Sequence, residues 1–225
     1  RGLEETPSFR AVHERGTGAA TRAPMRELLR YPRQILTVVG LTAGGTVAFY
    51  TFTTYAQKFL VNTAGWSKAD ASRISALTLF LFMLLQPVVG HISDRIGRRP
   101  VLIAFGVLGV LGTVPVLTAL ADARSETQAF LLLLAALTAI SGYTAINAVV
   151  KAELFPTAIR TLGVALPYAV TVSIFGGTAE YLALWAKSAG HEPWYYWYVT
   201  ACIGLSLTVY VLMPDTKRTS AIAEN

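Results

Sequence analysis

Charged side chains are scarce in this sequence: Asp, Glu, Lys and Arg make up only 14% of its 225 residues, whereas 53% are hydrophobic. Soluble domains carry roughly a quarter of charged residues, so the chain lacks the polar surface that a water-soluble globule needs. An abundance of apolar residues also excludes an intrinsically disordered chain. The composition therefore indicates a protein whose solvent is lipid.

Cysteine and histidine are rare as well. The single cysteine, Cys202, lies in an apolar segment, and the three histidines are far apart along the chain. A lone cysteine excludes a disulfide framework, and scattered ligand types argue against a metal cluster. No pairing of a nucleophile with a base stands out either. We therefore expect no metal site, no bound cofactor and no enzyme activity.

Six long segments free of charged residues are present. They are Gln34–Gln57, Ile74–Ser93, Pro100–Ala121, Thr127–Val150, Thr161–Ala179 and Pro193–Pro214. A helix that rises about 1.5 Å per residue needs roughly 20 residues to cross a hydrocarbon core about 30 Å thick. Membrane β-strands would be about 10 residues long, with alternating hydrophobicity. The sequence thus predicts an all-α integral membrane protein with six transmembrane helices.

The basic residues are distributed unevenly between the segments that connect these helices. One side of the membrane receives 14 of the 19 lysines and arginines, including the seven arginines of residues 1–33. Because cytoplasmic loops carry the excess of Lys and Arg, both termini are predicted to be cytoplasmic. The net charge of +6 is then a topology signal, and we expect no nucleic-acid partner. Residues 1–33 would form a cytoplasmic loop, residues 34–214 the membrane bundle and residues 215–225 a cytoplasmic tail.

Several predicted helices carry stripes of polar side chains, which are costly in a membrane and often functional. We predict that these side chains line a wet substrate cavity: Thr46, Tyr50, Thr53, Gln57, Gln86, Tyr143, Asn147 and Tyr168. The alternative is helix packing, since Ser and Thr also bond to backbone carbonyls and between helices. The third and sixth segments carry only scattered hydroxyls, so we expect them to face lipid.

The fifth segment continues beyond Ala179 with Glu180 and then six uncharged residues, so Glu180 is the one acid placed well inside a predicted span. Removal from water favours the neutral form of a carboxyl group, a property that suits a proton carrier. Glu180 is therefore a candidate for proton coupling. The alternative is a static ion pair, for which Lys58 is the nearest candidate by depth.

Two motifs occupy the turns on the predicted cytoplasmic side. The first, in residues 90–99, reads G-x-x-x-D-R/K-x-G-R/K-R/K and comprises Gly90, Asp94, Arg95, Gly97, Arg98 and Arg99. We expect Gly90 to admit a neighbouring helix and Gly97 to turn the chain. The second, E-x-F-P-x-x-x-R, runs from Glu153 to Arg160. A cluster of Asp94, Glu153 and Arg160 would act as a latch that closes in one conformation and opens in another.

Both motifs resemble signatures of the major facilitator superfamily, and the resemblance covers nearly the whole chain. Three stretches, residues 49–65, 151–156 and 174–181, are more narrowly similar to its metabolite:proton symporter branch. The resemblance implies the C-terminal six-helix half of a twelve-helix fold, with residues 1–33 as the central loop. The chain is then expected to be a fragment whose partner is an N-terminal six-helix half.

The same resemblance implies a function. We expect proton-driven uptake of a dicarboxylate, α-ketoglutarate foremost, across a bacterial inner membrane by alternating access, with H⁺ as the coupling ion. Other members carry citrate, shikimate, or zwitterions such as proline and betaine, and these remain alternatives. A membrane sensor that does not transport is a further alternative on the same fold.

Overall fold

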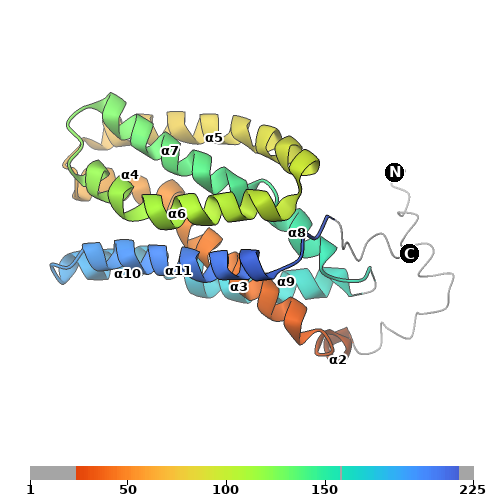
Figure 1. Ribbon diagram of the computed structural model, residues 1–225. Coiled ribbons are helices and arrows are strands. Elements are labelled where there is room, and N and C mark those ends of the chain that lie inside the picture. Colours follow the sequence, from red (N-terminus) through yellow and green to blue (C-terminus); the bar gives the residue numbers. More distant parts are fainter. Residues whose placement is uncertain (1–23, 158, 218–225) are drawn as a thin grey trace, which may run out of the picture.

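The computed structural model describes residues 24–157 and 159–217, and within these residues every regular element is helical (Figure 1). In the part of the chain that the structure describes, six helical spans are long and apolar enough to cross a membrane. Each predicted segment coincides with one of them: Pro32–Asn62, Lys68–Ile96, Arg98–Ala121, Glu126–Glu153, Arg160–Ser188 and Pro193–Leu212. The prediction of an all-α membrane bundle is therefore confirmed.

Three of the six spans are uninterrupted helices, namely α5 (Lys68–Ile96), α6 (Arg98–Ala121) and α11 (Pro193–Leu212). The other three are composite. The first consists of α3 (Pro32–Tyr50), the π-helical turn η2 (Thr51–Tyr55) and α4 (Ala56–Asn62). The fourth consists of α7 (Glu126–Thr144) and α8 (Asn147–Glu153). The fifth consists of α9 (Arg160–Thr171), the π-helical turn η3 (Val172–Gly176) and α10 (Ala179–Ser188). The short α2 (Pro24–Leu28) precedes the bundle.

Local sequence explains where several helices begin and end. The side-chain oxygens of Ser67 and Ser125 accept backbone N–H groups in the first turns of α5 and α7, which satisfies donors that a helix start leaves free. Pro32 and Pro193 occupy the first positions of α3 and α11, where no N–H is needed. Gly97 separates α5 from α6 with a φ of 103°, a conformation that favours glycine.

The core lies where α11 packs against α3 and α6, and α7 packs against α6 and α5. At the contact between α3 and α11, a Cβ on Gly44 would lie 2.3 Å from the carbonyl oxygen of Cys202. This close approach lets Ser206 accept a hydrogen bond from the Gly44 N–H (2.9 Å) and donate one to the Gly40 carbonyl (2.5 Å). Small residues thus allow two backbones to meet in the membrane.

The six spans differ in how far they are buried within the chain. The least buried spans are the second and the fifth. In their apolar stretches 22% and 28% of the residues are buried, against 33% and 44% for the third and sixth spans. On α5, large apolar side chains such as Phe80 and Met83 are more than half exposed. α6 and α11 pack against each other. These values describe packing within the chain alone, so the expectation that the third and sixth spans face lipid stays a prediction.

Candidate functional site

Three membrane spans depart from regular α-helix near the middle of the bundle. The fourth span breaks between Thr144, the last residue of α7, and Asn147, the first residue of α8. The side chain of Asn147 donates from Nδ2 to the Thr144 carbonyl oxygen (2.9 Å), a group that the break would otherwise leave without a partner. Discontinuous helices and π-helical turns commonly mark binding sites in transporters.

A polar and aromatic cavity of about 230 Å³ lies at this break. Its wall is formed by Thr46, Phe49, Tyr50, Tyr143, Thr144, Asn147, Tyr168 and Val172. Five of the eight side chains predicted to line a substrate cavity are in this list, and they come from α3, α7, α8 and α9. The fold therefore brings together residues that are more than 120 positions apart in the sequence.

Glycines position two of the tyrosine rings in this wall. A Cβ on Gly45 would lie 2.5 Å from the ring of Tyr143, and a Cβ on Gly176 would lie 2.6 Å from the ring of Tyr50. Real side chains essentially never approach so closely. The rings can occupy the centre of the bundle only because the facing residues on α3 and η3 have no side chain.

Gln86 lies next to the cavity but not in its wall. Its Oε1 accepts a hydrogen bond from the Thr144 hydroxyl (2.8 Å), while its Nε2 donates to the Phe82 carbonyl (2.9 Å). Gln86 thus holds the cavity residue Thr144 in place.

Thr53 and Gln57 are separated from the cavity. The Thr53 hydroxyl donates to the Phe49 carbonyl (2.5 Å), and Gln57 Nε2 donates to Ser72 Oγ (2.6 Å) on the exposed side of α5. Both residues were predicted to continue the stripe of Thr46 and Tyr50. The π-helical turn η2 adds a residue to one turn, so the 3.6-residue periodicity no longer keeps them on the cavity face.

Lys151 is the main feature of the site that sequence reasoning missed. The residue is 1% exposed. The ammonium group donates to Asn147 Oδ1 (3.0 Å), lies 3.9 Å from the ring centre of Tyr168 and 5.7 Å from that of Tyr143. We counted Lys151 among the cytoplasmic basic residues and did not predict it as a site residue. Its spacing of four from Asn147 and eight from Tyr143 nevertheless places it on their helical face.

Glu180 and Lys58 form an ion pair between α10 and α4. Their side chains are 35% and 51% exposed, so Glu180 is less enclosed than its position in the sequence suggests. The structure therefore contains the pair that we considered as the alternative to a proton carrier.

The first motif connects several helix ends on one side of the bundle. Arg98 pairs with Asp94 (2.6 Å) and lies 3.6 Å from a carboxylate oxygen of Glu153, whose other oxygen accepts from the Thr216 hydroxyl (2.5 Å). The Arg98 backbone N–H donates to Asp215 (3.1 Å). Thus Arg98 joins the ends of α5 and α8 to the segment that follows α11.

Other motif residues take different roles from those predicted. Arg160 bonds to the Phe155 carbonyl (3.2 Å) and to Thr157 Oγ1 (3.0 Å), so within the described residues Arg98, not Arg160, bridges the two acids. A Cβ on Gly90 would meet nothing within 4 Å, so no helix of the described chain approaches it.

The remaining motif residues lie around the same helix ends. Gly97 turns the chain as predicted, with Asp215 directly against it. The guanidinium of Arg99 donates to the carbonyls of Tyr210 and Val211 at the end of α11. Arg95 is exposed, and its backbone carbonyl accepts a hydrogen bond from Lys217.

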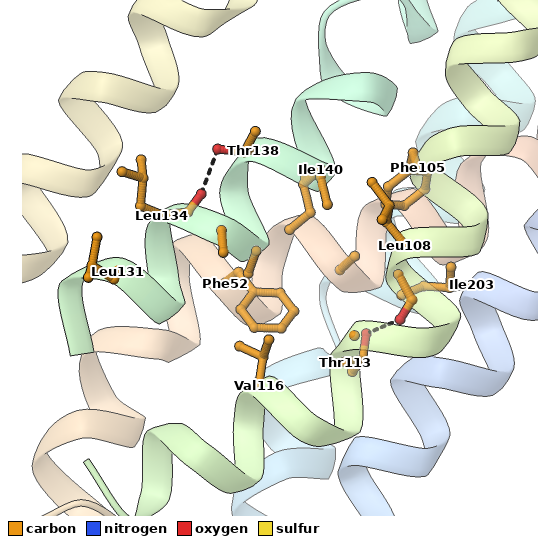
Figure 2. A pocket seen from close by; sticks show the side chains of 16 residues that line it. Phe52, Phe105, Leu108, Thr113, Val116, Leu131, Leu134, Thr138, Ile140 and Ile203 are labelled. Carbon is orange, nitrogen blue, oxygen red and sulfur yellow. Dashed lines mark hydrogen bonds between the residues drawn. The ribbon is translucent and has the colours of Figure 1, made fainter. Parts of the chain in front are cut away.

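A second and larger pocket, of about 580 Å³, lies between α6 and α7 against α3 and α11 (Figure 2). Its polar side chains are Thr113 and Thr138, and each hydroxyl donates to a carbonyl of its own helix, Gly109 and Leu134 (both 2.7 Å). The rest of its lining is aliphatic, aromatic or glycine. This pocket has no polar group available for an ionic substrate, so the smaller cavity is the candidate site.

Comparisons with known proteins agree with the motifs. Residues 10–224 match the Major Facilitator Superfamily. The chain is 46% identical to "Alpha-ketoglutarate permease" of Escherichia coli (95% of this chain, 48% of the relative) and 31% identical to "Citrate-proton symporter" of Klebsiella pneumoniae (99% and 49%). It is 29% identical to "Proline/betaine transporter" of Escherichia coli (90% and 42%). The chain spans about half the length of these curated relatives. No solved structure matches it significantly.

Proposed function

Because the chain belongs to the Major Facilitator Superfamily, we propose that it forms one half of a proton-coupled symporter that carries the dicarboxylate α-ketoglutarate by alternating access. The carrying observation is the polar cavity at the break between α7 and α8, inside a chain 46% identical to a permease named for that substrate. A cavity enclosed by discontinuous membrane helices is the usual position of a transporter's substrate site.

The other half is an N-terminal six-helix bundle in our proposal. Two observations support it: the chain covers 48% of the permease, and the spans least buried within the chain are the second and fifth. Large apolar side chains on these spans, such as Met83 and Ile174, are more than half exposed. A second bundle packed there would close the substrate path on its open side.

We place the protein in the bacterial inner membrane with both termini in the cytoplasm. The distribution of basic residues supports this orientation, with 14 of 19 on one side. The bridge centred on Arg98 then lies at the cytoplasmic end. The pair of Lys58 and Glu180 lies at the opposite end, facing the source of protons during uptake.

A zwitterion such as betaine is the second candidate substrate. Three tyrosines line the cavity, and aromatic faces attract quaternary ammonium groups. However, the rings of Tyr168 and Tyr143 already face the ammonium of Lys151. A second cation in the same space would be repelled, which favours an anionic substrate.

Uptake by the full-length protein tests this proposal. Cells that produce it are given labelled α-ketoglutarate, with and without a protonophore, in competition with citrate, shikimate or proline. We expect unlabelled α-ketoglutarate to compete best and the protonophore to abolish accumulation. Stronger competition by another compound would replace the substrate. Accumulation that resists the protonophore would contradict proton coupling.

A further inference from the structure

Lys151 is a buried cation without an anionic partner. Among the residues that the structure describes, no carboxylate forms a salt bridge with its ammonium group, which contacts only the Asn147 oxygen and two tyrosine rings. The nearest acid in the sequence is Glu153, whose carboxylate is engaged by Arg98 and Thr216 instead. The charge on Lys151 is thus enclosed but not neutralised.

Such an arrangement is energetically costly. A charge removed from water needs a partner of opposite sign for full compensation, and a neutral amide with aromatic faces compensates only in part. In membrane proteins, ionisable residues kept in this position typically belong to a substrate or ion pathway. The cost therefore points to a ligand that completes the pairing.

The position of Lys151 identifies where this ligand enters. All three residues that contact its ammonium group, Asn147, Tyr168 and Tyr143, line the polar cavity. The ammonium group lies directly behind the cavity wall. Tyr168 is 40% exposed, so its ring has room to turn aside. The flexible lysine stem could then bring the ammonium group into the cavity.

We propose that Lys151 binds a carboxylate group of the substrate and thereby selects anions over zwitterions. The carboxylate takes the place beside the ammonium group that the Tyr168 ring and Asn147 share, and a charge-assisted hydrogen bond replaces a contact with neutral groups. This inference rests on the proposed transport function. It adds the residue that recognises the negative charge.

A purely structural role would explain the same contacts. The stacking of Lys151 on Tyr168 joins α8 to α9 and could serve only to hold these helices together. In that case substitutions would change the stability of the protein. They would have no specific effect on the affinity for anions.

Direct binding to the purified full-length protein separates the two roles. Isothermal titration with α-ketoglutarate is compared for wild type, Lys151→Gln and Lys151→Arg, with Lys68→Gln as a control that makes the same change at an exposed site. Loss of one charge-assisted hydrogen bond should weaken binding about 10- to 100-fold in Lys151→Gln. Lys151→Arg should recover much of the loss, and Lys68→Gln should bind as the wild type does. Thermal unfolding without ligand checks that each variant is folded.

Two results would overturn the proposal. The first is unchanged affinity in Lys151→Gln. The second is a loss of affinity in Lys151→Gln that Lys151→Arg does not recover, although Lys151→Arg unfolds at the same temperature as the wild type. The positive charge would then be irrelevant to binding. If wild type binds citrate instead of α-ketoglutarate, the proposed substrate fails, and the same comparison with citrate decides the role of Lys151. If wild type binds only proline or betaine, both proposals fail.

Discussion

At the scale of single residues, the site depends on where side chains are absent as much as on where they are present. Gly44 and Gly45 are neighbours on α3 that face different partners, the backbone of α11 and the ring of Tyr143. Gly44 brings two helices together, whereas Gly45 leaves space for a residue of the cavity wall. The pair therefore links the packing of the bundle to the shape of the site.

Gly44→Ala should destabilise the protein because the new Cβ would lie 2.3 Å from a backbone oxygen of α11, which cannot move without shifting the helix. We expect a loss of about 1–3 kcal/mol in unfolding free energy, measured by thermal unfolding of the full-length protein. Gly112→Ala is the matched control, since its Cβ would meet nothing within 4 Å. Equal stability of the two variants would contradict the tight contact between α3 and α11.

Glu180→Gln tests the proposed role of Glu180 in proton coupling. The amide of glutamine can neither bind nor release a proton as a carboxyl group does. Proton-driven accumulation should therefore be lost, while exchange of internal for external substrate continues. Both are measured with labelled substrate in vesicles that contain the full-length protein. Lys58→Met, which removes the partner but leaves the carboxyl group, should retain more coupling than Glu180→Gln. Unchanged accumulation in Glu180→Gln would assign the pair a structural role.

At the scale of helices, the positions of the spans follow from the sequence, and their interruptions do not. A run of apolar residues between charges must cross the membrane, whatever its local geometry. The break at residues 145–146 and the π-helical turns contain neither proline nor, in η2, glycine. Thr, Tyr and Ile cost at most about 0.7 kcal/mol each relative to Ala in a helix, so none of them forces an interruption. The positions of the break and of the π-helical turns depend on packing between helices. They therefore cannot be predicted from the sequence of one segment.

The same limit explains which site residues were found. Tyr143 and Asn147 share a face of the predicted helix and remain together, whereas Thr53 and Gln57 follow a π-helical turn and diverge from it. Lys151 was missed because a basic residue at the end of a span usually indicates topology. Its aromatic neighbour Tyr168 belongs to another helix, so sequence spacing could not reveal the contact.

The bridge made by Arg98 connects α5, α6 and α8, so it should affect how these helices move rather than how the cavity binds. Arg98→Gln leaves Asp94 and Glu153 without their shared partner. We expect turnover to fall about tenfold, the scale of a modest coupling energy, with substrate affinity unchanged. Arg124→Gln, at an exposed arginine near the opposite end of α6, is the control. An equal loss of affinity and turnover would argue against a latch.

At the scale of the whole molecule, the described residues form a bundle with a candidate substrate cavity and two poorly covered spans. Its composition indicated lipid as the solvent, and its motifs indicated the superfamily to which it belongs. The symporter proposal joins these observations: a polar cavity at a helix break, a buried cation behind its wall, and an ion pair at the other end of the bundle.

Movement of protons together with substrate tests this account most directly. The full-length protein is reconstituted into liposomes that contain a pH-sensitive dye, and α-ketoglutarate is added outside without a pH gradient. The account predicts that the interior becomes acidic as the labelled substrate enters, and that neither change occurs without protein. Entry of α-ketoglutarate with no acidification would contradict it.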